Sequence, residues 1–362
     1  MVWGSVPWVT RRLALVCVVL VLLPQVVTAA TVATPRASPS TSDAPIPVEL
    51  PRDDGPHHVS TEWWYYTGHL LTAEGGRYGF ELVFFKGERG TLEGYAAHFA
   101  VTDYAGRQFH FDQRIVGAEG VSKPGTGFDL TIGSWAMRGA NGHDALRAAL
   151  PGYAIDLRLV SDKPAALHDG DGYIEYGDGT ASYYYSRTRL EIAGTLKVGD
   201  TARPVTGEAW MDHQWGNFQT YKDGGWDWFS MQLDDQTEVM LYLIRNAAGE
   251  VVLVDGSAID SDGTLTVLEA KDVSVEATGS WRSPASGTTY PSGWVVRLPA
   301  EDLSVRLTPS LENQELDTTA STGVTYWEGE VTLQGTRRGK AVGGLGYVEL
   351  TGYSPVREVG RP

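Results

Sequence analysis

The sequence predicts an all-β protein made of two tandem antiparallel barrels, and three observations support this class. Runs of aromatic and β-branched residues recur at roughly 8–12-residue spacing between Gly- and Asp-rich turns. No stretch shows sustained helical periodicity, and only residues 140–149 favour a short helical turn. The aromatic runs of the first half also have counterparts in the second half. This repetition predicts two similar units, each an antiparallel sheet that closes on itself.

The N-terminus predicts export. Arg11 and Arg12 precede an apolar run at residues 13–23, which small residues follow. This is the pattern of a signal peptide over residues 1–30, and the apolar run is short for a membrane span. Residues 31–50 are rich in Thr, Ser, Pro and Ala, which predicts a disordered tether. We therefore expect a secreted, periplasmic or extracellular protein.

Composition narrows the classes of partner. The net charge of −16 over 362 residues disfavours nucleic acid or an anionic membrane surface. The single cysteine, Cys17, lies inside the predicted signal peptide. The mature chain would then have no thiol for a disulfide, for nucleophilic catalysis or for metal binding.

The first predicted unit spans residues 51–222 and begins with three aromatic runs separated by Gly-containing turns. Its strands are expected at 62–70, 78–85, 95–102, 109–115, 128–135, 153–159, 172–176, 182–189 and 190–196. The second unit spans residues 223–356 and repeats the scheme. Asp227 followed by aromatics parallels Glu62 followed by aromatics, and the two units are expected to join near residues 220–224. Closed barrels of about eight strands can hold one apolar ligand.

The stretch 206–232 combines acids, a histidine and tryptophans. It places Asp212, His213 and Asp227 among Trp210, Trp215, Trp226 and Trp228. If this stretch is a strand, Asp212 and His213 face opposite sides, because side chains alternate along a strand. Carboxylates and imidazoles inside aromatic surface require partners, since burial of an unpaired charge is costly.

Five blocks occur in a fixed order over residues 50–354: His57 with Glu62–Leu70, Gly207–Gly216, Gly225–Phe229, Tyr326–Gly329 and Gly346–Tyr353. In these blocks the chain resembles the carotenoid 1,2-hydratase / AttH-type family of tandem lipocalin-like proteins. The resemblance implies two lipocalin-like β-barrels and places the chemistry at His213 and Trp215. Members that give the family its name add water to a terminal carotenoid double bond. Similar folds catalyse cyclisations, and many exported members are labelled only as predicted hydrolases.

A hydration needs an acid that stays neutral at working pH and aromatic faces that shield the cation. It requires no metal or organic cofactor. Asp212 is the predicted acid, His213 the water or proton partner, and Asp227 a second acid or orienting group. Trp215 and Trp226 would shield the cation. The wider predicted substrate-binding set is Trp210, Trp215, Trp226, Trp228, Glu62, Trp64 and Tyr66.

Structural alternatives stand beside these roles. Asp212, His213 and Asp227 could form a buried hydrogen-bond network that locks the two units together. His57 and Glu62 lie five residues apart, so on an extended chain they would face opposite sides unless a bulge intervenes. Glu62 could cap or cross-link the barrel. Glu328 and Glu349 occupy related positions in the second half, which favours a fold-building role for both.

Other functions are weighed against the leading hypothesis, which is an exported, cofactor-free, hydratase-like protein acting on an isoprenoid or polyene. The sequence has no Gly-x-Ser-x-Gly elbow and no His-Glu-x-x-His motif, so no metal site is predicted. The alternative is a non-catalytic carrier of a hydrophobic small molecule, which could approach a membrane surface through its ligand. A hydrolase of unknown substrate comes third, without residue support.

Overall fold

The computed structural model describes residues 45–90, 92–118, 126–176, 179–218 and 224–354. The predicted signal peptide, Cys17, residues 31–44 of the predicted tether and nearly all of the predicted junction lie outside the described residues. Within residues 45–50, Val48 and Leu50 are partly buried against the core of the first sheet.

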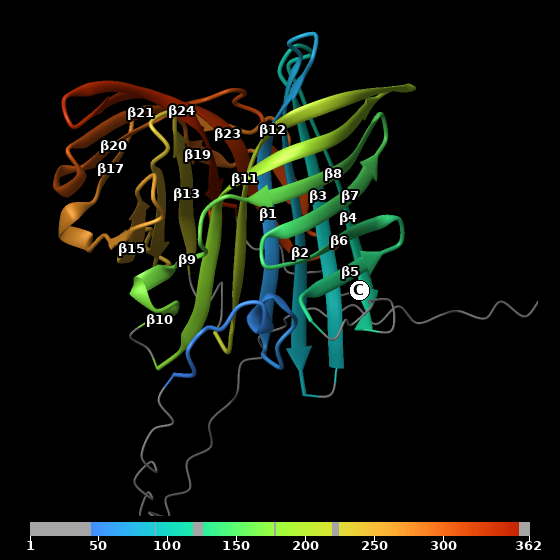
Figure 1. Cartoon of the computed structure of the whole chain (residues 1–362), viewed down its shortest axis with the longest axis horizontal. Coiled ribbons are helices and arrows are strands. Elements are labelled where there is room, and N and C mark those ends of the chain that lie inside the picture. Colours follow the sequence, from blue (N-terminus) through green and yellow to red (C-terminus); the bar gives the residue numbers. More distant parts are fainter. Residues whose placement is uncertain (1–44, 91, 119–125, 177–178, 219–223, 355–362) are drawn as a thin grey trace, which may run out of the picture. The chain divides into compact units, whose positions relative to one another are not determined.

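Twelve described strands form the first sheet, which is antiparallel at every pairing. Most of it lies at the right of Figure 1, in blue to yellow-green. Its strands are β1 (Thr61–Thr72), β2 (Arg77–Arg89), β3 (Leu92–Asp103), β4 (Gln108–Gly117), β5 (Phe128–Ile132), β6 (Trp135–Ala140), β7 (His143–Leu150), β8 (Tyr153–Ser161), β9 (Ala166–Leu167), β10 (Tyr173–Glu175), β11 (Ala181–Val198) and β12 (Thr201–Gly216). The main path runs β4-β3-β2-β1-β12-β11-β8-β7-β6-β5.

Ten described strands form the second sheet, coloured yellow to red in Figure 1. They are β13 (Gly225–Leu233), β14 (Glu238–Arg245), β15 (Val251–Ile259), β16 (Leu265–Val267), β17 (Ser274–Ala277), β20 (Trp294–Leu298), β21 (Leu303–Pro309), β22 (Glu315–Thr318), β23 (Val324–Arg337) and β24 (Lys340–Leu350). A two-stranded sheet joins β18 (Ser280–Arg282) to β19 (Thr289–Pro291).

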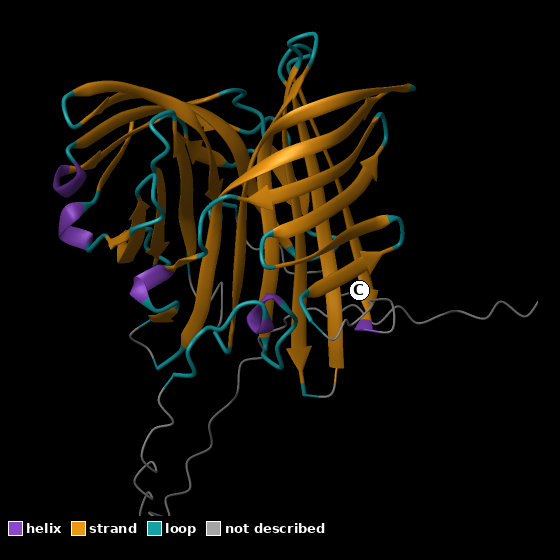
Figure 2. Cartoon of the chain, viewed as in Figure 1, coloured by secondary structure: helices purple, strands orange, loops and turns teal. Residues whose placement is uncertain are grey.

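Helical structure is sparse, as Figure 2 shows. The described 3₁₀ helices are η1 (Arg52–Asp54), η3 (His168–Gly170), η4 (Ala270–Asp272) and η5 (Pro299–Glu301). None of the helices in the described residues has the length and apolar character needed to cross a membrane.

The predicted all-β, lipocalin-like class is confirmed, with three corrections of detail. Residues 140–149 form the end of β6, a turn at 141–142 and most of β7 rather than a helical turn, and Asp144, Leu146 and Ala148 are buried at alternate positions of β7. The strands expected at 182–189 and 190–196 form one strand, β11, which carries an irregularity between Arg187 and Leu190. The first sheet nearly closes, since its edge strand β4 contacts β5 and β7. In the described part of the second sheet, the edge strands β16 and β17 do not pair with each other.

Strand β1 divides its side chains between two environments. Trp64, Tyr66 and Leu70 point into the buried interior of the first barrel. Trp63 and Tyr65 point the other way, toward the second sheet. This alternation is the ordinary consequence of strand geometry, but here both faces are buried.

We call the region where the two sheets face each other the seam. Its buried aromatic and aliphatic members are Tyr65, Val83, Ile174, Tyr184, Trp210, Trp226, Trp228, Met240, Tyr242 and Tyr347. The sheets approach closely at Gly79 of β2, where an added Cβ would lie 2.5 Å from Tyr347 Oη. A larger residue there would have to push the Tyr347 side chain aside, so contact between the sheets, rather than the backbone angle, favours glycine.

Candidate functional site

Four carboxyl groups meet in the seam. Glu81 on β2 and Asp212 on β12 come from the first sheet, and Glu328 on β23 and Glu349 on β24 come from the second. Glu81 and Glu328 are each 1% exposed. Glu328 lies directly opposite Glu349 in the β23–β24 ladder. The cluster therefore needs residues from both sheets.

Two tyrosines cross the seam in opposite directions to reach these acids. Tyr326 of the second sheet donates its O–H to Oε1 of Glu81 at 2.9 Å. Tyr65 of the first sheet donates to Oε1 of Glu328 at 2.8 Å. In both glutamates Oε2 is buried and has no hydrogen-bond partner among the described residues. Each acid thus has one oxygen fixed by a tyrosine and one oxygen left over.

These surroundings raise the pKa of every carboxyl group in the cluster. Burial raises the pKa of Glu81 to about 8, against the opposing effect of the Tyr326 hydrogen bond. Burial, and then the charges of Glu81 and Glu349, raise the pKa of Glu328 well above its ordinary value. Burial also raises the pKa of Glu349 to about 7. Burial therefore favours the neutral form of Glu81 and Glu328, and Oε2 is the free position for a proton.

Asp212 lies in the same seam, and both of its carboxylate oxygens accept hydrogen bonds. Burial raises its pKa to about 6. Its Oδ1 accepts from the Ser186 hydroxyl and from Trp210 Nε1, and its Oδ2 accepts from the Tyr184 hydroxyl. Tyr184 in turn accepts from Trp228 Nε1 at 2.9 Å. Asp212 is therefore well placed to hold the two sheets in position.

The tryptophans predicted to bind substrate are divided between two places. Trp210, Trp226 and Trp228 lie in the seam, where Trp226 Nε1 donates to Oε2 of Glu349 at 2.8 Å. Trp215 lies instead in the interior of the first barrel, together with Trp64. The alternation along β12 separates Trp210 from Trp215, as it separates Asp212 from His213.

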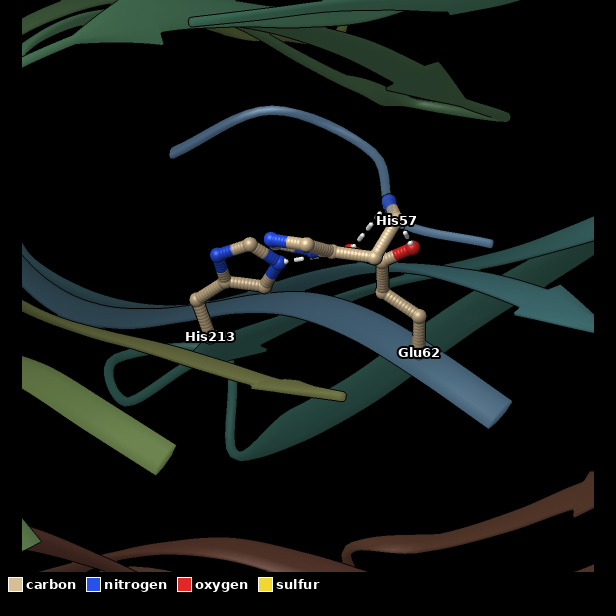
Figure 3. A group of neighbouring side chains, drawn as sticks. All are labelled: His57, Glu62 and His213. Atoms are coloured by element: carbon tan, nitrogen blue, oxygen red, sulfur yellow. Dashed lines mark hydrogen bonds and ion pairs between the residues drawn. The ribbon is translucent and has the colours of Figure 1, made fainter. Parts of the chain in front are cut away.

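His213 occupies the barrel side of β12, opposite the seam. It meets Glu62 of β1 and His57 of the preceding loop (Figure 3). His57 Nδ1 and His213 Nε2 lie 2.7 and 2.9 Å from Glu62 Oε1. The His57 backbone N–H also donates to Glu62 Oε1 and Oε2, at 3.2 and 3.0 Å. We call these three residues the His–Glu–His cluster.

The loop before β1 explains a difference from the sequence expectation. His57 and Glu62 were expected on opposite faces of an extended chain. Residues 55–60 instead form bends and coil before the strand begins at Thr61, so the loop turns His57 back over Glu62. The His57 ring then stacks on Trp215, with ring centroids 4.2 Å apart and an interplanar angle of 1°.

The charge of Glu62 is compensated. Burial would raise the pKa of the Glu62 carboxyl, but hydrogen bonds with His213 and His57 outweigh burial and leave the pKa below its ordinary value. Lys86 Nζ adds a cation 3.8 Å from Glu62 Oε2. Burial lowers the pKa of His213, with partial compensation from Glu62. Nδ1 of His213 has no partner among the described residues.

The remaining predicted residues lie apart from both clusters. Asp227 interacts with Arg245 Nε at 3.1 Å and with the Tyr353 hydroxyl at 3.0 Å. Tyr66 donates to Oδ2 of the buried Asp144 at 2.9 Å inside the first barrel. Asp212, His213 and Asp227 therefore do not converge on one point, and each belongs to a different network.

Sequence reasoning missed Glu81, Tyr65 and Tyr326 as site residues, and it gave Glu328 and Glu349 a fold-building role. One signal for Glu81 was present: it is a lone acid within the run Phe80-Glu-Leu-Val-Phe-Phe of β2. An acid in a strand that is buried on both faces needs either a partner or a raised pKa.

Comparisons with known proteins agree with this architecture. A solved structure of a Nitrosomonas europaea protein named AttH is 31% identical, with a TM-score of 0.78 over 85% of this chain and 98% of that protein. The structure of kievitone hydratase from Nectria haematococca is 17% identical, with a TM-score of 0.69 over 85% of this chain and 94% of that one. CghA with bound Sch210972 is 13% identical, with a TM-score of 0.57 over 86% and 96%.

Among curated proteins, kievitone hydratase of Fusarium solani subsp. phaseoli is 25% identical over 205 residues. The match covers 54% of this chain and 56% of that protein, so the chain matches just over half the length of this relative. The profile of the AttH-like family matches residues 41–353. The match spans both sheets, and the chain belongs to the AttH-like family.

Proposed function

We propose that the seam is the catalytic site of a cofactor-free hydro-lyase, which adds water to a carbon–carbon double bond of an apolar substrate. The observation that carries this proposal is the pair Glu81 and Glu328. Each is a buried acid with a raised pKa, a tyrosine on one oxygen and no partner on the other. Such a group can donate a proton at neutral pH, which is what protonation of an alkene requires.

The reaction needs one acid and one water molecule. The Oε2–H of Glu328 donates its proton to one alkene carbon, and the π electrons form the new C–H bond. The other carbon becomes a carbocation, which Trp226, Trp228 and Tyr65 shield with their aromatic faces. Water attacks that carbon, forms the C–O bond and returns a proton to the Glu328 carboxylate. The net change is addition of water, and the acid is regenerated.

Access to the seam is proposed through a groove of about 630 Å³. Phe109, His110, Trp281 and Leu311 are among the residues that line it. Phe109 also packs against a small buried cluster that contains Tyr326, the tyrosine bound to Glu81. A substrate in the groove would approach the seam acids past Phe109, on the side of Tyr326.

The proposed substrate is an isoprenoid or polyene, and the site would meet it after export. A tertiary cation suits the aromatic seam, and isoprenoid double bonds give such cations on protonation. The kievitone hydratases among the relatives support a hydration in general, and a carotenoid-type polyene is the finer proposal.

The test is incubation of the purified protein with an acyclic carotenoid and a short prenyl alcohol in ¹⁸O-labelled water, with product analysis by mass spectrometry. We expect a labelled tertiary alcohol. Glu328→Gln should lower kcat by about 10²–10⁴-fold, the usual contribution of a general acid, and Glu81→Gln should lower it by less, because Glu81 transfers no proton in this reaction. Glu315→Gln is the matched control, because Glu315 is a buried glutamate of the second sheet bound to Ser283, Ser286 and Tyr290, outside the seam.

Binding of the probes without incorporation of label would contradict a hydratase and favour the carrier. Equal activity in Glu328→Gln, Glu81→Gln and the wild type would remove the seam acids from the mechanism, whatever the substrate.

A further inference from the structure

The His–Glu–His cluster brings three ligand-type atoms together on the barrel side of β1 and β12. The candidate ligand atoms of His57, Glu62 and His213 all lie within 4.8 Å of one another. They come from a loop, the start of β1 and the end of β12, so the fold assembles them from distant parts of the sequence (Figure 3). Glu62 and His213 are fully buried, and the His57 side chain is 21% exposed.

The donor set is that of a borderline divalent ion. Two imidazole nitrogens and one carboxylate oxygen are ligands that zinc uses in sites that keep an open fourth position. Cobalt and nickel accept the same donors. Zinc bonds of about 2.0–2.2 Å place tetrahedral ligand atoms roughly 3.3 Å apart. The two imidazole nitrogens lie 2.7 and 2.9 Å from Glu62 Oε1. Outward movement of about half an ångström would therefore admit an ion.

The surroundings orient these side chains as metal ligands are usually oriented. His57 Nε2, the ring nitrogen away from Glu62, lies 3.4 Å from Asp53 Oδ1. A carboxylate behind a histidine ligand is the common arrangement at metal sites. Trp215 stacks on the His57 ring, and Trp64 stacks on the His213 ring with centroids 4.6 Å apart.

Two features need to be weighed against a metal ion. Lys86 Nζ lies 3.8 Å from Glu62 Oε2 and would repel a cation on that side. Both imidazoles face Oε1 instead, and Lys86 is itself paired with Glu88 at 2.5 Å. If a metal ion lies on Nε2, the His213 ring carries its proton on Nδ1, which has no acceptor among the described residues, and this weighs against the ion.

We propose that His57, Glu62 and His213 bind one divalent transition-metal ion of the zinc type, which fastens the loop before β1 to the end of the first barrel. The sequence alone predicted no metal site, because the ligands do not form a local motif. This site lies on the opposite face of β12 from the seam acids, and the proposed hydration requires no metal. The two proposals can therefore fail separately.

The test uses the full mature chain, freed of metal by a chelator and titrated with Zn²⁺ by calorimetry and with Co²⁺ by visible absorption. We expect one equivalent of metal ion to bind and to raise the Tm of the protein. The Co²⁺ form should show the visible absorption band of an ion with a low coordination number. His57→Ala changes a partly exposed loop residue and should still fold. It should weaken binding by at least about 100-fold, more than the loss expected for an outer partner. Asp53→Asn should weaken it by about 10-fold.

His69→Ala is the matched control, since His69 forms a single His–Glu pair with Glu330 at 2.7 Å. It should leave metal affinity unchanged. Failure of the wild type to take up either ion would overturn the proposal, and so would equal affinity in wild type and His57→Ala. Equal losses in His57→Ala and His69→Ala would also overturn it, because the loss would not be specific to the cluster. The hydration activity of the metal-free protein tests only the proposed catalytic site in the seam.

Discussion

Glu62 and Glu328 are buried glutamates on strands of the same molecule, and their surroundings push them in opposite directions. Glu62 meets two histidines, a backbone N–H and Lys86, and its pKa is lowered. Glu328 meets a tyrosine and two other carboxyl groups, and its pKa is raised well above the ordinary value. Burial is nearly the same for both.

The comparison shows that neighbours, rather than depth, decide the state of a buried acid. Burial disfavours the charged form in both places, but only Glu62 has cationic and N–H partners that recover the cost. One group is thereby held as an anion suited to orient imidazoles. The other is held as a neutral acid with a proton to give.

The largest expected effect comes from removal of each acid in turn. Glu62→Ala should lower the free energy of unfolding at pH 7 by about 3–5 kcal/mol, because it leaves Lys86 and the histidines without their anion. Glu328→Gln should instead raise it at pH 7, because the unfolded chain ionises Glu328 and the raised pKa in the folded chain costs stability that a neutral amide avoids. Urea denaturation of both variants measures the difference. Equal losses would show that the two acids do not differ in charge state.

The next effect is on pH dependence, and its sign follows from the raised pKa of Glu81. The unfolded chain ionises Glu81 near 4.5, whereas the folded chain does so near 8. The stability contributed by the proton is complete below about pH 4.5 and is lost as pH rises to about 8. The free energy of unfolding of Glu81→Gln should therefore rise relative to that of the wild type by roughly a few kcal/mol between pH 5 and 8. Glu250→Gln, on an exposed turn, should follow the wild type. Parallel curves for wild type and Glu81→Gln would contradict a raised pKa.

A smaller effect is expected from the tyrosines that cross the seam. Tyr326→Phe removes the hydroxyl that bonds Glu81 and should cost about 1 kcal/mol of stability. That hydrogen bond lowers the pKa of Glu81, so its loss should raise the pKa further. The loss of stability with rising pH that Glu81 causes, followed by urea denaturation, should then extend to higher pH. A shift toward lower pH would mean that Tyr326 favours the protonated acid.

The smallest expected effect concerns access of the substrate to the seam acids. Glu62 has no proposed role in binding the substrate and needs no such access. Phe109→Ala widens the proposed groove without touching a carboxyl group. It should change KM by about 3-fold or less and leave kcat equal to the wild-type value, because the groove binds the substrate and the transition state equally well. Steady-state kinetics on the best substrate of the hydration assay measure this. A large fall in kcat would give Phe109 a part in the chemistry.

The fold was largely predictable from the sequence because its signals are local. Aromatic and β-branched runs bounded by turns located most strands, and the repeated blocks indicated two sheets. The helical turn expected at residues 140–149 failed because Ala and Leu are common to helices and strands. Only the alternating burial of Asp144, Leu146 and Ala148 against the first core identifies a strand.

The site was only partly predictable because its contacts are long-range. Tyr326 and Glu81 are 245 residues apart, and Tyr65 and Glu328 are 263 apart. No local pattern pairs such residues. The sequence showed that Asp212 and His213 alternate along the strand. It could not show that both faces of β12 are buried, one in the seam and the other against His57 and Glu62. The turn of the loop that brings His57 to Glu62 was equally hidden.

The alternation of β12 also limits how this gene can change in length. Asp212 serves the seam and His213 serves the barrel, and β1 and β11 hold the strand in register on both sides. A single residue inserted or deleted within β12 ahead of them would turn Asp212 toward the barrel interior and His213 toward the seam, and would disrupt both sets of contacts. Substitutions can be tested one face at a time. Insertions within this strand change both faces together. We therefore expect differences in length among relatives to be confined to the turns on either side of β12.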